Sequence, residues 1–320
     1  MTNIDLVVLK EASPAAVGVS IEVLDAVNRI AGRRLLNWRI LSPSGAQTTA
    51  RGGLLMPAQP MVRAQPRDIV ILPGLGAGTD AEVTARLAEP DAGQAARWVA
   101  RAWTRGATVA ASCTGVFVLG AAGLLEGRRC TSTWWLVPAL QAAFPAALAS
   151  ADAMVTEHDR VWTAGAALAH IDLMLALVGR FLSPSLAESV ARHLVVDQRA
   201  SQARYVIPAH LAAHDPLACT IEAAVRDRLG ETITLRDLAA AGGVTTRTLA
   251  RRIQAATGLS PMRFVQKIRL DTALHLLQST RLPLEAVAER LGFADAATLY
   301  RLVRRHTGQA PGAFRGPERY

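Results

Sequence analysis

The chain has few cysteines, almost no lysine and few aromatic residues. Its 320 residues include three cysteines, Cys113, Cys130 and Cys219, two lysines, Lys10 and Lys267, and 5% aromatic residues. Three scattered cysteines cannot build a disulfide framework, and they favour a reducing compartment. No basic segment followed by an apolar segment opens the chain, so we predict no signal peptide and expect a cytoplasmic protein. No motif predicts a metal site or a cofactor.

One uncharged window runs from Gly106 to Leu125. It contains four glycines and a polar Ser112-Cys113-Thr114 centre, which a membrane-spanning helix would not favour. The window is better interpreted as a buried strand, a tight turn and a buried helix. We therefore predict no association with a membrane.

The basic charge is concentrated near the C-terminus. The formal net charge is +9, and 51% of the residues are hydrophobic, which argues against disorder. From Cys219 to Tyr320 there are 16 Lys and Arg against 9 Asp and Glu, an excess of seven. The preceding 218 residues hold the other 19 and 17, an excess of two. A basic C-terminal domain fits a partner that carries phosphate, although a coding bias toward arginine explains the scarcity of lysine equally well.

The first two-thirds of the chain alternate between short apolar runs and helical patterns. Strands are predicted near residues 4–9, 38–41, 68–72 and 107–111, and helices over 20–31, 92–105, 116–125, 166–182 and 184–199. This alternation predicts an α/β domain with a mostly parallel sheet flanked by helices. We place that domain at residues 1–195, followed by a linker at 196–218 that contains prolines and shows no periodicity.

Cys113 lies where a predicted strand turns into a helix. A cysteine on such an elbow, at a helix N-terminus, is placed to act as a nucleophile or a redox sensor. The alternative is a small buried cysteine with no chemical role, which is the commoner fate of a free cysteine.

Several segments of this domain together resemble the ThiJ/PfpI family, which has a class I glutamine-amidotransferase-like fold with a cysteine elbow. These segments are Asp68–Gly78, Ser112–Gly115, Ala122–Gly127, Thr131–Trp134, Thr163–Gly165 and Ile171–Leu173. The resemblance covers roughly residues 4 to 182. It implies a sensor or ligand pocket, for which the candidate residues are Cys113, Thr114, Gly76, Thr133 and His170. His170 lies in an apolar helical pattern, and a buried structural histidine is the competing interpretation.

The catalytic residues of the enzymes in that family are missing here. Those enzymes pair the cysteine with a histidine just before a tryptophan, where this chain has Thr133 before Trp134. They also carry an acid near the first helix, but no carboxylate lies between Glu11 and Glu22. Glu157 and His158 fit a hairpin turn better than a catalytic role. We predict no catalytic residues; a thiol-dependent amidase or hydratase that uses Cys113 is the alternative.

A repeat with an offset of about 50 residues organises the C-terminal third. Thr248-Leu249, Arg251, Thr257-Gly258, Pro261 and Phe264 recur as Thr298-Leu299, Arg301, Thr307-Gly308, Pro311 and Phe314. Each copy fits a helix–turn–helix unit followed by the start of another helix. An all-α DNA-binding domain is therefore predicted over residues 219–320.

The second helix of each unit presents residues suited to contact DNA. In the first unit these are Thr246, Arg247, Ala250 and Arg251, and in the second Ala296, Ala297, Thr298, Arg301 and Arg304. The helix predicted from Pro261 to about Gln278 is long enough to hold the two units about one DNA turn apart, roughly 34 Å.

This region resembles the AraC/XylS family over about residues 220 to 316, most closely in Gly292-Phe293-x-Asp295-x-x-Thr298-Leu299-x-Arg301. Together the two domains resemble the GlxA type of these regulators. The resemblance implies a transcription regulator that binds double-stranded promoter DNA, with a small-molecule effector and a homodimer as expected partners and RNA polymerase as a further candidate. The nature of the effector, and whether the thiol state of Cys113 takes its place, are left open by the sequence.

Overall fold

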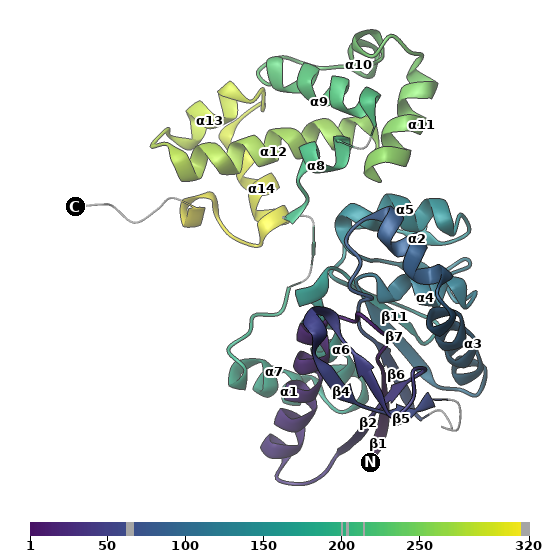
Figure 1. Cartoon of the computed structure of the whole chain (residues 1–320). Helices are drawn as coiled ribbons and strands as arrows, with labels where there is room; N and C mark the ends of the chain where they lie inside the picture. The colour runs from purple at the N-terminus through teal and green to yellow at the C-terminus, as the bar shows by residue number, and fades with distance from the viewer. Residues whose placement is uncertain (62–66, 200, 203–204, 214, 315–320) are drawn as a thin grey trace. The chain divides into compact units, whose positions relative to one another are not determined.

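The computed structural model describes residues 1–61, 67–199, 201–202, 205–213 and 215–314. The chain divides into two compact units, Met1–Gln202 and Ala203–Tyr320 (Figure 1). The segment expected to be a linker, 196–218, contains the short helix α8 (Pro208–Ala212) and the start of α9 (Pro216–Asp227), and part of it lies outside the described residues.

The N-terminal unit is built on a seven-stranded sheet with the order β10-β11-β7-β6-β1-β2-β5. All neighbouring strands are parallel except β10 and β11, which form an antiparallel hairpin at one edge. The strands of this sheet are β1 (Thr2–Val7), β2 (Leu36–Ser42), β5 (Gln59–Pro60), β6 (Ile69–Leu72), β7 (Thr108–Ser112), β10 (Val155–His158) and β11 (Val161–Ala164). Two small ribbons, β3 (Gln47–Thr49) with β4 (Leu55–Pro57) and β8 (Arg129–Cys130) with β9 (Leu148–Ala149), complete the strands. The predicted α/β fold with a mostly parallel sheet is confirmed.

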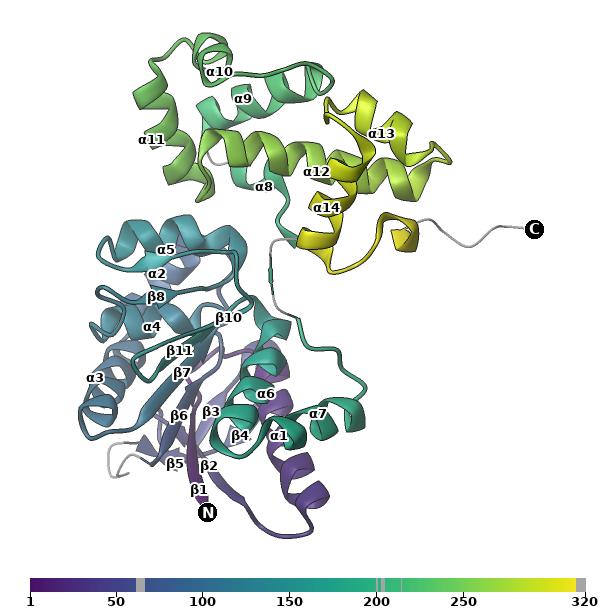
Figure 2. The ribbon, with the colours of Figure 1, turned by 180° about the vertical axis from the view of Figure 1, so that it is seen from behind.

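Helices cover both faces of this sheet (Figures 1 and 2). On one face lie α2 (Asp80–Ala88), α3 (Pro90–Thr104), α4 (Gly115–Ala121) and α5 (Val137–Ala143), and on the other α1 (Pro14–Ala31), α6 (His170–Phe181) and α7 (Pro184–His193). Strand β6 contributes side chains to the hydrophobic core on each face of the sheet. Val70 and Leu72 pack toward α3, whereas Ile69 and Ile71 pack toward α6. A strand buried on both faces explains the continuous apolar run in the sequence.

Of the helix boundaries that differ from the prediction, two differ most. Helix α1 begins at Pro14 rather than near residue 20, because Ser13 caps it and Pro14 suits the first helical position. Helix α7 ends at His193 rather than at residue 199, and Arg199 instead pairs with Asp172 on α6. The hairpin turn predicted at Glu157–Asp159 is formed by Asp159 and Arg160, both in the left-handed region, whereas Glu157 and His158 belong to β10.

The C-terminal unit is entirely helical in its described part. After α8 and α9 come α10 (Leu235–Ala241), α11 (Thr246–Thr257), α12 (Pro261–Ser279), α13 (Leu284–Arg290) and α14 (Ala296–Thr307). Helix α12 packs against both α11 and α14, so one long helix joins the two helix–turn–helix units (Figures 1 and 2). No helix of the described chain is long and apolar enough to cross a membrane.

The repeat predicted from the sequence is a repeat of structure. Leu249 and Leu299 are both fully buried, and Thr257 and Thr307 both donate a hydrogen bond to a carbonyl four residues back. Gly258 and Gly308 end their helices with φ values of 70° and 75°. Only glycine adopts this conformation without strain, which explains why both copies keep it.

Candidate functional site

Cys113 lies on a strained elbow between β7 and α4. Its φ is 54°, a left-handed value that is uncommon for a residue with a side chain. Its backbone N–H donates to the carbonyls of Ala164 at 3.1 Å and Gly165 at 2.7 Å. Ser132 Oγ donates to the Cys113 carbonyl at 2.7 Å. Hydrogen bonds from two neighbouring loops therefore hold the elbow in place.

Thr114 and Thr133, two of the candidate pocket residues, lie beside this elbow. Thr133 Oγ1 donates a hydrogen bond to Cys113 Sγ at 3.0 Å. Thr114 Oγ1 accepts a hydrogen bond from the backbone N–H of Leu75 at 2.9 Å, which ties the loop after β6 to the elbow. A threonine hydroxyl cannot take up a proton near neutral pH as an imidazole can, so Thr133 supplies polarity next to the thiol but no base.

The glycine-rich loop after β6 comes close to both Cys113 and the loop after β1. A Cβ on Gly74 would lie 3.1 Å from Cys113 Cβ, and a Cβ on Gly76 would lie 2.1 Å from the Glu11 carbonyl oxygen. Gly76 also has a φ of 75°. Glycine is therefore required at Gly76 by both space and conformation. Gly76 lies two residues after Gly74, the glycine that faces Cys113.

His170, the remaining pocket candidate, lies in the interior beside Ser112, the residue before Cys113. It is fully buried, and its two ring nitrogens bond Ser20 Oγ at 2.7 Å and Ser112 Oγ at 2.8 Å. Burial lowers the pKa of His170 to about 4, which keeps the ring neutral. With both nitrogens bonded, the contacts of His170 favour the competing interpretation, a structural residue that joins α6 to α1 and β7.

The other two cysteines have different surroundings. Cys130 is buried, and burial raises the pKa of its thiol to about 11. Cys219 is exposed on α9, and its Sγ contacts the Ala212 carbonyl at 3.2 Å. A thiolate is the reactive form of cysteine, so Cys130 is the least reactive of the three thiols.

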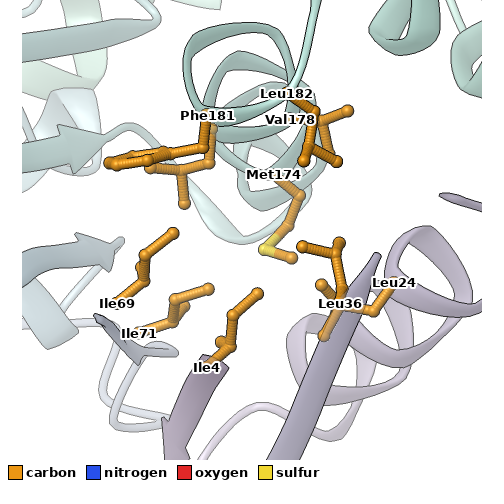
Figure 3. Close-up of a pocket in the computed structure, with 10 residues that line it drawn as sticks. Ile4, Leu24, Leu36, Ile69, Ile71, Met174, Val178, Phe181 and Leu182 are labelled. Carbon is orange, nitrogen blue, oxygen red and sulfur yellow. The ribbon is translucent and has the colours of Figure 1, made fainter. Parts of the chain in front are cut away.

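An apolar cavity lies at the opposite end of the sheet from the elbow, near the start of β1 and β6 (Figure 3). Figure 3 shows Ile4, Ile69 and Ile71 of the sheet pointing toward Met174 and Phe181 of α6. The cavity volume is about 10 Å³, which is about what one water molecule requires. It therefore has no room for an effector.

The candidate DNA-binding helices α11 and α14 begin in the same way. Thr245 Oγ1 accepts a hydrogen bond from the Thr248 N–H at 3.2 Å, and Asp295 Oδ1 accepts one from the Thr298 N–H at 2.5 Å. The bond to Thr298 also holds the pKa of Asp295 below its usual value. Each cap fixes the start of its helix and so sets which of the following side chains face outward.

The predicted DNA-contacting residues are accessible to different degrees. Arg247, Arg251, Ala297, Arg301 and Arg304 are exposed, whereas the following are half-buried: Thr246, Ala250, Ala296 and Thr298. None of these arginines forms an ion pair within the described part of the chain. Arg301 donates a hydrogen bond to Thr298 Oγ1 at 3.0 Å. In the described part of the chain, both helices thus present exposed guanidinium groups that form no ion pair, which suits contact with phosphate or base edges.

Arg252 behaves differently from its neighbour Arg251. It forms a two-pronged ion pair with Asp215, with both Nη2–Oδ distances at 2.8 Å. Asp215 also caps α9 by accepting a hydrogen bond from the Ala218 N–H. This pair ties α11 to the start of α9, and the sequence pattern gave no indication of it because the partners are 37 residues apart.

Known proteins resemble both parts of the chain. The DJ-1/PfpI family matches residues 19–180, and a helix-turn-helix domain matches residues 238–316. The HTH-type transcriptional regulator GbdR of Pseudomonas aeruginosa is 29% identical over 313 residues, which are 97% of this chain and 83% of that protein. The regulator GlxA of Rhizobium meliloti is 27% identical over 299 residues, 92% of this chain and 89% of that one.

Solved structures support the same assignment for the fold. An AraC family transcriptional regulator from Pseudomonas putida matches with a TM-score of 0.53 and 22% identity, over 61% of this chain and 100% of that chain. A ThiJ/PfpI family protein from Pseudomonas syringae matches with a TM-score of 0.52 and 19% identity, over 76% of this chain and 90% of that one. The chain belongs to the DJ-1/PfpI family, among the members that carry an AraC-type helix–turn–helix domain.

Proposed function

We propose that this protein is a transcription regulator that binds specific DNA sequences through α11 and α14 and is controlled by an effector at the cysteine elbow. The observation that carries the DNA-binding part is the repeated presentation of exposed arginines that form no ion pair within the described residues: Arg247 and Arg251 on α11, and Arg301 and Arg304 on α14. The full-length similarity to proteins named transcriptional regulators supports the same function.

A genome-wide footprint of the tagged protein in its own cells tests this proposal. We expect discrete sites, each with two protected segments about one helical turn apart, because two recognition helices on one connecting helix enter successive major-groove segments. The genes beside the sites would indicate the class of effector. Diffuse occupancy under every growth condition would contradict sequence-specific binding.

The effector site that we propose is the neighbourhood of Cys113, Thr114, Thr133 and Gly76. These residues combine a partly accessible thiol, hydroxyl groups and close-packed backbone at the carboxyl ends of parallel strands. Ligands bind most often at that edge of an open α/β sheet. A homodimer, and contact with RNA polymerase, remain part of the proposal as further partners.

We also propose that the elbow has no catalytic activity. Thr133 donates a hydrogen bond to the thiol where a base would be needed, and His170 is occupied by Ser20 and Ser112. Nucleophilic catalysis needs a group that accepts the thiol proton and returns it to the leaving group. Turnover of amide or isonitrile substrates that disappears in Cys113→Ser would show instead that the domain is a thiol enzyme.

The partial exposure of Cys113 favours one second candidate, a sensor of thiol oxidation. In that case peroxide would change the DNA affinity of the parent protein but not of Cys113→Ser. The exposed Cys219 has to be replaced by serine in both proteins, so that its own oxidation does not contribute. Equal responses to peroxide would exclude Cys113 as the sensor.

A further inference from the structure

A side chain from the end of the N-terminal unit lies beside the cysteine elbow. Gln202 is the last residue of that unit and is only 2% exposed. Its Nε2 donates hydrogen bonds to Thr131 Oγ1 at 2.8 Å, to the Ser132 carbonyl at 3.0 Å and to the Ala153 carbonyl at 3.2 Å. Three acceptors therefore surround one nitrogen in a buried site.

The carbonyl half of the same carboxamide is not satisfied. Gln202 Oε1 is buried, and no hydrogen-bond partner reaches it from the described residues. Two of the three acceptors around Nε2 are backbone carbonyls, so exchanging the oxygen and nitrogen of the carboxamide would bring acceptors together. Burial of an acceptor without a hydrogen bond is unfavourable. The site is thus complementary to the nitrogen of Gln202 but not to its oxygen.

This nitrogen site shares two residues with the elbow. Ser132, whose carbonyl accepts from Gln202, donates through Oγ to the Cys113 carbonyl. Gly165, whose carbonyl accepts from the Cys113 N–H, packs directly under the carboxamide, because a Cβ on Gly165 would lie 2.2 Å from its carbon. Ser132 and Gly165 therefore each contact both the Cys113 backbone and the carboxamide of Gln202.

The residues just before Gln202 are also fastened to the N-terminal unit. Arg199 forms an ion pair with Asp172 at 2.6 Å, and Ser201 Oγ donates to the Asp152 carbonyl. Gln202 is the last of these anchors before the chain continues to the DNA-binding unit. Arg199, Ser201 and Gln202 thus each form a contact with the N-terminal unit.

We propose that Thr131 Oγ1, the Ser132 carbonyl and the Ala153 carbonyl form a subsite for the primary nitrogen of an effector, either an amide or an ammonium group, and that Gln202 fills it until the effector displaces it. This inference rests on the proposed function, since it supplies the link from the elbow to the DNA-binding unit. A primary ammonium brings three N–H donors to three acceptors and no unsatisfied carbonyl. A primary amide reproduces the contacts of Gln202 itself.

Hydrogen exchange of residues 196–207 in the full chain, followed by mass spectrometry, tests the role of Gln202 as an anchor. Gln202→Ala should raise the exchange rate of this segment by about tenfold or more, because local opening sets the rate. Gly165→Ala should have the same effect while leaving Gln202 in the sequence, since its methyl group takes the space of the carboxamide. The matched control is Gln198→Ala, which removes an exposed carboxamide from the same segment.

Small probes test the chemistry of the subsite. Acetamide or methylammonium chloride should raise the same exchange rate in the parent protein, and N,N-dimethylacetamide, which has no N–H donor, should not. A response to acetamide alone would identify an amide subsite, and a response to methylammonium alone an ammonium subsite. Unchanged exchange in both Gln202→Ala and Gly165→Ala, or no response to either probe, would overturn the inference. These exchange measurements do not involve DNA. A footprint without discrete sites would therefore contradict the proposed function but would not change the exchange results.

Discussion

The two helix–turn–helix units have the same scaffold but different attachments. Leu249 and Leu299 occupy equivalent buried positions on α11 and α14. Arg252 on α11 is paired with Asp215 at the start of α9, whereas the residue 50 positions later is Leu302. Among the described residues, an ion pair therefore ties the first unit, and not the second, to the start of α9.

The turns of the two units also differ by one residue. Four residues separate α10 from α11 and five separate α13 from α14, so the offset of 50 in the second helices becomes 49 in the first helices. Gly243 and Gly292 take the left-handed position in their turns, with φ values of 60° and 68°. The two units therefore share the buried leucines and left-handed glycines that their folding requires. They differ at positions that contact other parts of the chain, such as Arg252 and Leu302.

The largest effect is expected at the shared core. Leu249→Ala and Leu299→Ala should each lower the unfolding free energy by about 2–5 kcal/mol, because both leave a cavity at a fully buried position. Far-UV circular dichroism of the full chain in denaturant measures the loss. All six tryptophans lie at or before residue 162, so tryptophan fluorescence reports the N-terminal unit and should not change. A loss of unfolding free energy in only one variant would show that the two buried positions are not equivalent.

Acid should lower the unfolding free energy of the N-terminal unit, which contains His170, by a similar amount. The pKa of His170 is about 4 in the folded protein, against 6.5 ordinarily, so the unfolded chain binds the proton first as the pH falls. The stability of the N-terminal unit should drop between about pH 6.5 and pH 4, by on the order of 3 kcal/mol at most.

Denaturation followed by tryptophan fluorescence at pH 7 and pH 4.5 measures this drop. The variant His170→Gln should be less stable at pH 7 and should show a flatter dependence on pH. An equally steep pH dependence in the variant would assign the effect to another group.

The neighbouring arginines Arg251 and Arg252 on α11 should respond differently to replacement by alanine. Arg251→Ala should weaken binding to a specific site by about 1–3 kcal/mol, because an exposed arginine is free to pair with a base. Arg252→Ala should lower stability by about 1 kcal/mol or less, since its pair with Asp215 is partly exposed to solvent. Electrophoretic mobility shifts give the affinities. A larger loss of DNA affinity for Arg252→Ala than for Arg251→Ala would contradict the assignment of Arg251 as the residue that contacts DNA.

A smaller loss of stability than at the shared core is expected at the turns. Gly243→Ala should cost about 1–2 kcal/mol, the penalty of a left-handed residue with a side chain. Gly292→Ala should cost more, because its Cβ would also lie 3.0 Å from the carbonyl oxygens of Leu229 and Gly230. Thermal unfolding of the C-terminal unit by circular dichroism compares the two. Equal losses would mean that the contact with Leu229 and Gly230 adjusts without cost.

Local features were predictable from the sequence, and long-range partners were not. The cap Asp295 and the terminal Gly308 define α14 by rules of helix ends, and Ser13-Pro14 marked the start of α1 by the same rules although we placed it later. The bonds of His170 to Ser20 and Ser112 span 150 and 58 residues, and Gln202 reaches back 71 residues to Thr131. Such pairings depend on how strands and loops come together, which periodicity and spacing do not encode.

The central claim, that both recognition helices read one duplex, is tested most directly by selection of binding sites from random DNA. The parent protein, Arg251→Ala and Arg301→Ala would be selected in parallel. The account predicts that each variant loses base preference at a different position, and that the two positions lie about 10 base pairs apart. Loss of preference at the same position in both variants, or at none in either, would contradict it.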